Sequence, residues 1–394
     1  MPWDQIIIDL PKYKIEEVKE VGPKTVRFFV RYEGEITCPH CQGVNLRKKD
    51  RFWRRVRHWV MGHHQLSELW IRAYQYFCRQ CCCYFHPRFP GILPFKRSSE
   101  TFRKQVAMEH HEGIAQRTLS KRFRLSSATI ERWYQDFVHL EVQKQLGAAC
   151  PKVLGIDEHF FTRKRGYATT LCDLRKHRVY DVHLGRSEKA LGGFFEQLKE
   201  RDNVQIVLMD LAEPYRCLCR KYFPRAKIVA DRFHVIRLVN HHFLEVWKQL
   251  DPKGRKHRGL LSLMRRHPWK LRKEQGKTLR KYLLEVPGLL PLYEFKQRLI
   301  QMLLQKTKRA KECKRLIPAF LQLIEDLKNS GFERMKTLGF TLERWQEEIV
   351  RMWRFSKTNS ITEGFHNKME MLSRRAYGFR NFENYRLRVK VHCG

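Results

Sequence analysis

Short apolar segments between residues 151 and 234 constrain the fold more than any other feature of the chain. PKVLGIDEHF, GYATTLCDL and HRVYDVHLG predict three strands, and SEKALGGFFEQLKE has the spacing of a helix. VQIVLMDLAEPY and PRAKIVADRFHV predict a fourth and a fifth strand. With a helix between these last two, the segments alternate in the way that is typical of an α/β domain.

This order of three strands, helix, strand, helix and strand is that of an RNase H-like fold. Asp157 and Asp210 end the first and the fourth predicted strands, and side chains at carboxyl strand ends converge where ligands bind. A single aspartate there more often caps a turn or pairs with a basic residue, because a buried carboxylate needs a partner. Two such aspartates, together with Glu363 on a later helix, favour bound Mg²⁺. Two Mg²⁺ ions about 4 Å apart stabilise the attacking and leaving oxygens of an in-line phosphoryl displacement. Asp231, beside His234 at the end of the fifth strand, remains an alternative to Asp210.

Glu363 also has an interpretation that involves no function. It lies in KTNSITEGFHNKMEML, three residues after Ser360. Ser followed three residues later by Glu is the capping-box pattern, in which the two residues satisfy each other's backbone N–H groups at a helix start. Taken alone, the motif predicts a helix cap rather than a catalytic glutamate.

The cysteine pattern predicts a metal site near the N-terminus. Of twelve cysteines, Cys38 and Cys41 form one Cys-x-x-Cys pair and Cys78 and Cys81 form another. Two such pairs suit tetrahedral Zn²⁺ better than they suit unrelated buried thiols. Cys82 and Cys83 follow directly, so the fourth ligand is open among residues 81, 82 and 83. We expect zinc to supply folding energy to a segment with little core, and the six remaining cysteines to be small core residues.

The charge of the chain indicates a polyanionic partner. Lys and Arg number 79 against 41 Asp and Glu, which gives a net charge of +38. Nucleic acid is the expected partner and a membrane surface the second choice. No stretch reaches about 18 consecutive apolar residues, and the N-terminus lacks the order of a signal peptide. We therefore expect a cytoplasmic protein without a membrane anchor. RKKDRFWRRVRHW, at residues 47–59, mixes cations with rings and suits either phosphate contacts or a solvated basic strand.

Residues 101–139 predict a helix-turn-helix. TFRKQVAMEHHEG, TLSKRFRL and SSATIERWYQDFV read as three helices, the last capped by Ser126 or Ser127. Ile130, Trp133 and Phe137 are expected to form its packed face. Its exposed face would then present short and charged groups to DNA base edges, and the candidate DNA-binding residues are Ser127, Thr129, Glu131 and Arg132.

Four further stretches carry a resemblance to a known family. GIDE at 155, VLMD at 207, ADRFHV at 230 and TNSITEGFHNKME…RRAYGFRNFENYRLRV at 358–389 resemble the DDE transposases of the bacterial insertion-sequence family ISL-three, or ISL3. The resemblance places a catalytic triad on Asp157, Asp210 and Glu363. It implies Mg²⁺ or Mn²⁺ at that triad, and strand cleavage and transfer on double-stranded DNA at element ends and at a target. It also implies a homo-oligomer on DNA in the bacterial nucleoid.

His234, Asn359 and Lys368 are expected to support phosphate or the carboxylates. A DNA-binding regulator derived from a transposase, a nuclease that never joins strands, and a basic DNA-packaging protein remain alternatives.

The interval of 153 positions from Asp210 to Glu363 predicts a helical insertion. Residues 251–320 carry 20 Lys and Arg against 5 Asp and Glu, so this insertion is expected to lie along DNA. The predicted fold is an α/β, RNase H-like catalytic domain interrupted by this insertion and preceded by a small zinc domain and a helix-turn-helix. The predicted domains are a zinc-knuckle domain at 1–95, the helix-turn-helix at 96–148, the first catalytic part at 149–234, the insertion at 235–352 and the C-terminal catalytic part at 353–394.

Overall fold

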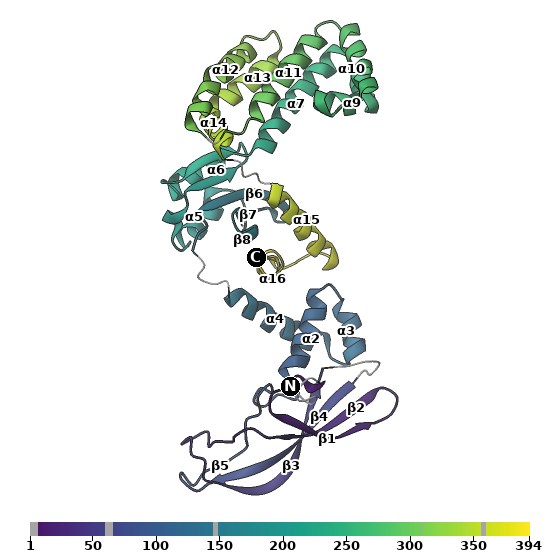
Figure 1. Ribbon diagram of the computed structural model, residues 1–394, viewed down its shortest axis with the longest axis vertical. Helices are drawn as coiled ribbons and strands as arrows, with labels where there is room; N and C mark the ends of the chain where they lie inside the picture. Colours follow the sequence, from purple (N-terminus) through teal and green to yellow (C-terminus); the bar gives the residue numbers. More distant parts are fainter. Residues whose placement is uncertain (1–6, 60–65, 145–148, 308, 356–359) are drawn as a thin grey trace. The chain divides into compact units, whose positions relative to one another are not determined.

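A computed structural model describes residues 7–59, 66–144, 149–307, 309–355 and 360–394, without the side chain of Ser360. The chain divides into two compact units, residues 1–144 and residues 145–394 (Figure 1). The five-domain division stays a prediction. No helix in the described part of the chain is both long enough and apolar enough to cross a membrane.

Unit 1 begins with a five-stranded sheet in the order β1-β2-β4-β3, with β5 paired to β4. The strands are β1 (Tyr13–Glu20), β2 (Thr25–Tyr32), β3 (Leu46–His58), β4 (Leu66–Cys78) and β5 (Tyr84–Phe85). β2 and β4 run parallel, and the other pairs are antiparallel. The basic stretch at 47–59 is β3 and the segment that follows it.

The sheet of unit 1 has a hydrophobic core of its own, so the expectation of a segment with little core is wrong. Val26, Phe28 and Val30 alternate along β2 and are buried against Leu69 and Ile71 of β4. A side-chain period of two places such residues on one face of a sheet. The cysteine pairs belong to a separate small cluster with Tyr76 and Phe85.

Three helices complete unit 1, as predicted: α2 (Glu100–His111), α3 (Gln116–Phe123) and α4 (Ser127–Gln143). Ser126 caps α4, because its hydroxyl accepts the N–H of Thr129 at 3.2 Å. The packed face of α4 differs from the prediction. Ile130, Tyr134 and Val138 are buried at spacings of four, whereas the predicted Trp133 and Phe137 are only half-buried at its border.

Unit 2 contains a second five-stranded sheet, in the order β10-β9-β6-β7-β8. Its strands are β6 (Val153–Thr162), β7 (Gly166–Asp173), β8 (Arg178–Leu184), β9 (Ile206–Met209) and β10 (Lys227–Ala230). β6, β9 and β10 run parallel, while β6, β7 and β8 form an antiparallel meander. α5 (Glu188–Glu196) and α6 (Glu213–Tyr222) lie between these strands in the chain. The predicted order of strands and helices from 151 to 234 is confirmed.

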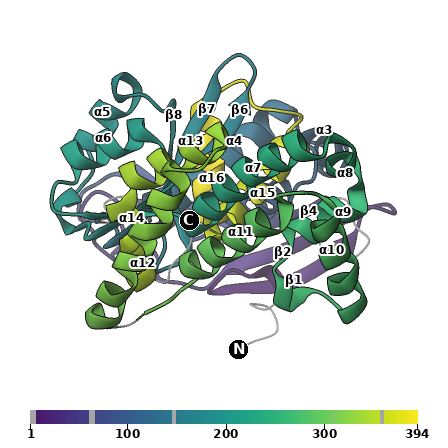
Figure 2. The same ribbon diagram turned by 90° about the horizontal axis from the view of Figure 1, so that it is seen from above.

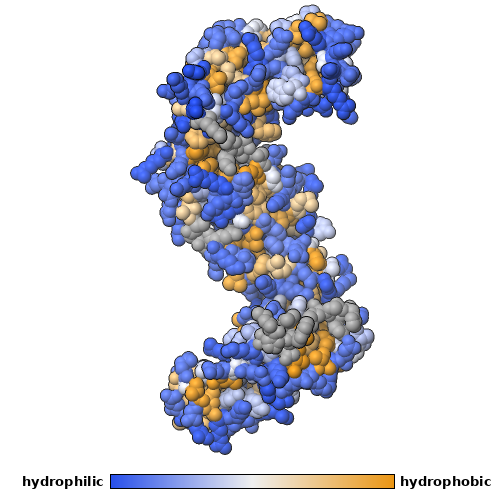
Figure 3. Space-filling view, viewed as in Figure 1, coloured by the Kyte–Doolittle hydropathy of each residue, from blue (hydrophilic) through white to orange (hydrophobic). Residues whose placement is uncertain are grey.

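In the described part of the chain ten α-helices follow β10, and all of them except α8 share one core cluster with the sheet. They are α7 (Arg232–Leu250), α8 (Pro252–Lys256), α9 (Arg258–Arg265), α10 (Lys273–Glu285), α11 (Leu289–Leu303), α12 (Ala310–Lys328), α13 (Glu333–Arg344), α14 (Gln346–Arg354), α15 (Ser360–Arg375) and α16 (Phe382–Cys393). α7 packs against α11 and α13 (Figure 2), and α14 packs against β10. Hydrophilic residues cover much of the face of these helices seen in Figure 3, with hydrophobic patches between them.

Buried polar contacts fix the helices to the sheet. Arg216 of α6 forms a two-pronged ion pair with Glu348 of α14 at 3.0 and 3.3 Å, and both side chains are buried. Arg232, the first residue of α7, donates to the carbonyl of Met352 at 2.8 Å. Because a buried charge is tolerated only when it is paired, these contacts hold α7 and α14 beside β10. Of the six cysteines expected in the core, Cys217 is exposed and the other five are buried.

Candidate active site and metal-binding cluster

The two Cys-x-x-Cys pairs of unit 1 adopt matching turns. In each turn the first cysteine donates its N–H to a carbonyl five residues later, at 3.0 Å, from Cys38 to Gly43 and from Cys78 to Cys83. The residue after the second cysteine has a left-handed backbone in both turns, with φ of 59° at Gln42 and 58° at Cys82. This repeated geometry gives each turn two inward-facing sulfurs.

The four sulfurs of Cys38, Cys41, Cys78 and Cys81 lie within 4.8 Å of one another. The Cys38–Cys81 and Cys41–Cys78 sulfur pairs are 3.5 Å apart, close to the roughly 3.8 Å edge of a tetrahedron of Zn–S bonds. The N–H of Cys81, with other hydrogen bonds, lowers the pKa of Cys78 to about 7. Cys82 is exposed and Cys83 donates to the Cys81 carbonyl, so of the three alternatives Cys81 is the one that joins the cluster.

Three aspartates lie at one edge of the sheet in unit 2, where the parallel pairing of β6, β9 and β10 ends. Asp157 lies on β6 just beyond its last pairing with β9, at Gly155. Asp210 directly follows β9, and Asp231 directly follows β10. Asp231 is also the N-cap residue of α7. The prediction that Asp210 follows the fourth strand is confirmed, whereas the prediction that Asp157 ends the first strand is wrong, because pairing with β7 continues β6 to Thr162.

Two neighbouring pockets divide the acidic residues. One, of about 420 Å³, is lined by Asp157, Glu158, Asp231 and Glu363. The other, of about 830 Å³, is lined by Asp210. Their common wall consists of Phe233, His234, Ile236 and Arg237 of α7. Among the described residues, no three acidic or histidine side chains bring their ligand atoms as close together as the four cysteines do.

The charges at this edge repel one another. Burial, together with the weaker effect of the negative charges of Asp210 and Asp231, raises the pKa of Asp157 to about 6. Burial also raises the pKa of Asp210, while His234 lowers it. The hydrogen bond from His234 Nδ1 to Asp231 Oδ2, 2.8 Å long, raises the pKa of His234. A site with this excess of negative charge favours a bound cation.

Asp210 and Asp231 differ in how their oxygens are used. Asp231 is 1% exposed and accepts the bond from His234. Asp210 Oδ1 is buried and has no hydrogen-bond partner among the described residues. A buried carboxylate oxygen without a partner is costly. Asp210 therefore has a free oxygen that fits a divalent cation.

A chain of hydrogen bonds leads from α16 to His366, which lies beside Asp157, and includes residues that sequence reasoning missed. Tyr385 bonds His159 Nε2 at 2.8 Å, and His159 Nδ1 bonds Thr170 at 2.9 Å. Thr170 bonds His366 Nε2 at 3.1 Å, and His366 Nδ1 lies 4.0 Å from Asp157 Oδ2. Burial lowers the pKa of His159 to about 3 and that of His366 to about 4, so both rings are neutral.

One sequence signal could have revealed His366, because it lies three residues after Glu363 in EGFHNK. Residues three apart in a helix share a face, and both side chains line the 420 Å³ pocket. Thr170 and His159 gave no such signal. Their pairing depends on the register between β6 and β7.

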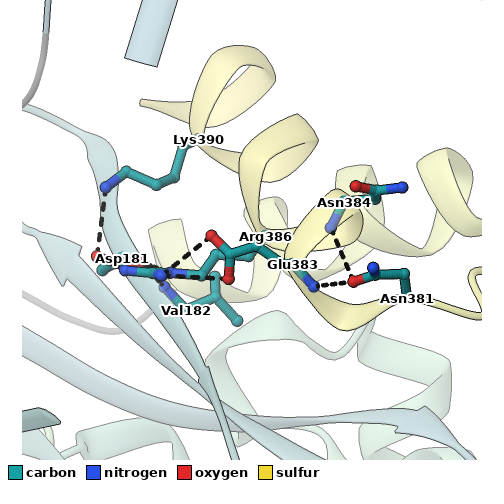
Figure 4. Close-up of polar contacts among 7 residues, drawn as sticks. All are labelled: Asp181, Val182, Asn381, Glu383, Asn384, Arg386 and Lys390. Atoms are coloured by element: carbon teal, nitrogen blue, oxygen red, sulfur yellow. Dashed lines mark hydrogen bonds and ion pairs between the residues drawn. The ribbon is translucent and has the colours of Figure 1, made fainter. Parts of the chain in front are cut away.

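An ion-pair cluster anchors α16, which carries Tyr385. Asp181 of β8 accepts two bonds of 2.7 Å from Arg386 and one of 3.3 Å from Lys390 (Figure 4). Burial raises the pKa of Asp181, but Arg386 and Lys390 outweigh that effect and lower it. At the start of the helix, Asn381 accepts the N–H of Glu383 at 2.8 Å. These contacts hold α16 against the strand beside β7.

The other candidate residues have varied settings. Glu363 is exposed in the first turn of α15, and its proposed capping partner, the Ser360 side chain, lies outside the described residues, as does Asn359. Lys368 is exposed, with its ammonium 5.7 Å from the Phe365 ring. In α4, Ser127 and Arg132 are exposed and Thr129 is half-buried. Glu131 accepts hydrogen bonds from Gln116 and Gln135, so it is engaged within the protein.

Comparison with known proteins identifies the family. Residues 154–389 match the transposase family of the DDE type named for ISL3, and residues 34–82 match the zinc-finger of transposase IS204/IS1001/IS1096/IS1165. The transposase for insertion sequence element IS1001 of Bordetella parapertussis is 25% identical over 249 residues. That match covers 60% of this chain and 60% of the relative.

The chain belongs to the ISL3 family of DDE transposases. Its N-terminal unit contains a zinc-ribbon region with a four-cysteine cluster, which supports Zn²⁺ as a bound metal. The resemblance inferred from the sequence is confirmed.

Proposed function

We propose that the chain cleaves DNA at the ends of an insertion sequence and joins those ends to a target, with Asp157, Asp210 and Glu363 as the metal-binding residues. The observation that carries the proposal is the meeting of acids where the parallel pairing of three adjacent strands ends, beside the pocket that Glu363 lines. That region lies within the match to the transposase family. Three strands in a meander, two parallel strands and their helices support an RNase H-like domain, with α7–α14 as its insertion.

Asp210 is the proposed middle ligand, although Asp231 shares a pocket with Asp157. Its unpartnered buried oxygen supports this choice, and so does the use of Asp231 as a partner of His234. In this proposal Asp231 orients His234 in the wall between the two pockets. Glu158 and Arg237 also line this wall region and set the local charge.

Divalent cations bound to these carboxylates, Mg²⁺ or Mn²⁺, would polarise a phosphodiester and activate water or a 3′-hydroxyl for in-line displacement. The residues of the chain supply the negative charge that holds such cations and a buried setting that strengthens the attraction. Neutral His366 directs Nδ1–H toward Asp157 if Thr170 donates to its Nε2. That arrangement orients the carboxylate without adding charge.

DNA binding is assigned to both units. In unit 1 the exposed Ser127 and Arg132, with Thr129, would contact base edges, and Zn²⁺ on Cys38, Cys41, Cys78 and Cys81 would stabilise the ribbon. In unit 2 the basic helices between 251 and 320 would contact phosphates. The division into domains at 1–95, 96–148, 149–234, 235–352 and 353–394 is a working proposal, as is a homo-oligomer on DNA.

The proposal is tested with the Glu363→Gln variant. The purified variant is incubated with labelled element ends, a target plasmid and Mg²⁺, and strand cleavage and joining are measured. The amide preserves shape and capping ability but removes a charge from the coordination sphere. Folding and DNA binding should persist, while cleavage and joining should fall by at least 10²–10³-fold, about 3–4 kcal/mol of barrier. Mn²⁺ should replace Mg²⁺, whereas Ca²⁺ should fail.

Glu370→Gln is the matched control, because Glu370 lies on the same helix and its carboxylate pairs with Arg374 at 2.6 Å. It should retain full activity. A Glu363→Gln protein that joins ends at the wild-type rate would return Glu363 to a capping role. Cleavage without joining in the wild-type protein would indicate a nuclease.

A further inference from the structure

A cleft in unit 1 lies outside both regions matched by the family comparisons, apart from part of β3. Its volume is about 950 Å³. We call it the 86–97 cleft, after the segment that forms one wall opposite β3. Its lining residues are Phe52, Trp53, Arg54, Arg55, Arg57, His86, Pro87, Arg88, Phe89, Ile92, Pro94, Phe95, Lys96 and Arg97.

Phe95 has an unusual setting at the tip of this wall. The turn Leu93–Lys96 is closed by a bond of 3.2 Å from the N–H of Lys96 to the carbonyl of Leu93. Pro94 occupies its second position and Phe95 its third, with φ of 59°. A positive φ at the third position favours Gly or Asn over a bulky side chain. The Phe95 ring is nevertheless fully exposed, at 102% of its reference area.

The turn that presents Phe95 is firmly attached to the sheet. Arg54 of β3 donates to the carbonyls of Leu93 at 3.3 Å and Lys96 at 3.4 Å. Before the turn, Phe89 and Ile92 are buried in the core of the sheet. After it, the N–H of Arg57 bonds the carbonyl of Arg97 at 2.9 Å. The ring is therefore held outward by a fixed support.

The charges around the ring are all of one sign. Arg88, Lys96 and Arg97 are exposed, and among the described residues none of the three has an ion-pair partner. No acidic residue lines the cleft. The Trp53 ring packs instead against Phe29, with ring centroids 5.5 Å apart, so Phe95 is the fully exposed ring beside these cations. Cations beside an exposed ring match the sugar-phosphate backbone and the flat bases of a nucleic acid.

We propose that the 86–97 cleft binds DNA and that the Phe95 ring stacks on a base exposed at an unpaired or opened step. The proposal deepens the proposed function, since it names the DNA feature that unit 1 recognises. Stacking needs an accessible base face, which an intact duplex offers only where a step is kinked or unpaired. Arg88, Lys96 and Arg97 would contact the phosphates on either side. Arg54 is a positioning residue that holds the turn.

The test uses the full chain and three fluorescent probes: a 30-base-pair duplex, the same duplex with one unpaired nucleotide, and that bulged duplex with 2-aminopurine at the unpaired position. Wild-type protein should bind the bulged duplex more tightly than the intact one. Phe95→Ala should lose about tenfold in affinity for the bulged probe, and Phe95→Trp should restore it. Wild-type protein should quench 2-aminopurine, and Phe95→Ala should not.

The salt dependence of DNA affinity distinguishes the contribution of the Phe95 ring from that of the basic side chains. Phe95→Ala removes no charge, so its salt slope should equal that of wild type, whereas Arg97→Gln should reduce the slope by about one. Tyr84→Ala is the matched control, because Tyr84 is an exposed aromatic residue of the same unit outside the cleft. It should leave the preference for the bulge unchanged.

The outcomes distinguish this inference from the proposed function. If the wild-type chain binds no DNA, the proposed function fails. If it binds DNA but Phe95→Ala binds the bulged probe equally well, only the stacking role fails. Binding to anionic lipid vesicles that depends on Phe95, with unchanged DNA affinity, would assign the cleft to a membrane surface and overturn the proposal.

Discussion

The cysteine cluster of unit 1 and the acidic residues of unit 2 differ in how closely their candidate metal-binding atoms lie. Four sulfurs lie within 4.8 Å of one another, whereas the carboxylates are divided between two pockets. A thiol can remain neutral until a metal binds, so packed cysteines cost little. Carboxylates at neutral pH repel one another, and burial raises the pKa of Asp157 to about 6.

This difference indicates two kinds of metal site. A preformed cluster inside a small core suits a permanent structural ion. Separated acids around an open pocket suit cations that are completed by substrate phosphates, as Mg²⁺ sites usually are. The predictions below test this contrast.

Removal of zinc should have the largest effect. Cys78→Ser removes one of the four thiolates and should abolish the binding of about one zinc per chain. The cluster should then lose stability, because metal binding energy on the order of 10 kcal/mol is folding energy in such sites. Elemental analysis measures the metal, and hydrogen exchange locates the damage. Exchange should increase around Tyr76 and Phe85, while the separate core at Val26 and Leu69 stays protected.

Cys82→Ser is the matched control, since Cys82 is exposed at the same turn. It should keep the zinc. Loss of metal from Cys82→Ser, with metal retained by Cys81→Ser, would reassign the fourth ligand.

Asp210→Asn and Asp231→Asn should separate the two candidates for the middle ligand. Asp210→Asn should lower strand cleavage on the order of 10³-fold, about 4 kcal/mol of barrier, with DNA affinity unchanged. Asp231→Asn should reduce activity only partially and lower thermal stability, because it weakens the bond to His234. Cleavage rates and melting temperatures measure both. The opposite pattern would make Asp231 the ligand.

Lys296 tests the effect of a buried charge in unit 2. It is 2% exposed in α11, and its Nζ bonds the Met264 carbonyl at 2.6 Å. Burial lowers the pKa of Lys296 to about 7. An unfolded lysine titrates near 10.4, so between these values the unfolded chain binds one more proton. Stability should therefore fall as the pH falls from about 10 to about 7.

Lys296→Met should raise the free energy of unfolding at pH 7, by roughly 2–4 kcal/mol. The gain should shrink toward pH 10, as the wild-type lysine loses its proton in the unfolded chain too. Chemical denaturation at several pH values measures this. Lys281→Met is the control, because that lysine is 81% exposed, and a similar gain there would contradict burial as the cause.

The smallest effects are expected in DNA recognition. Arg132→Ala in α4 should cost about 1–3 kcal/mol for the preferred sequence and relax sequence preference. Replacing Lys277, Arg280 and Lys281 of α10 by Gln should instead lower the salt slope by about one per residue, with preference intact. Binding titrations over a salt series distinguish the two. Equal loss of sequence preference in both variants would contradict the assignment of these roles.

The sequence by itself determined the family, the cysteine pairs and the order of strands and helices. These depend on local signals: spacing within a turn, the period of apolar residues and short motifs such as EGFHNK. Asp210 and Asp231 could be placed at strand ends for the same reason, whereas the extent of β6 beyond Asp157 could not. The buried face of α4 was misjudged by one residue at Trp133 against Tyr134, because the helix packs with neighbours that the period alone does not specify.

Only the tertiary structure decided which side chains contact one another and which are buried. The register of β6 and β7 sets Thr170 opposite Asp157 and within reach of His159, and the packing of α16 on β8 brings Tyr385 to His159. Packing buries Lys296 among residues that a charge count assigns to a DNA-binding surface. The turn at 93–96 leaves Phe95 exposed. Each outcome depends on residues distant in the chain, because burial and pairing are properties of the packed fold rather than of any short segment.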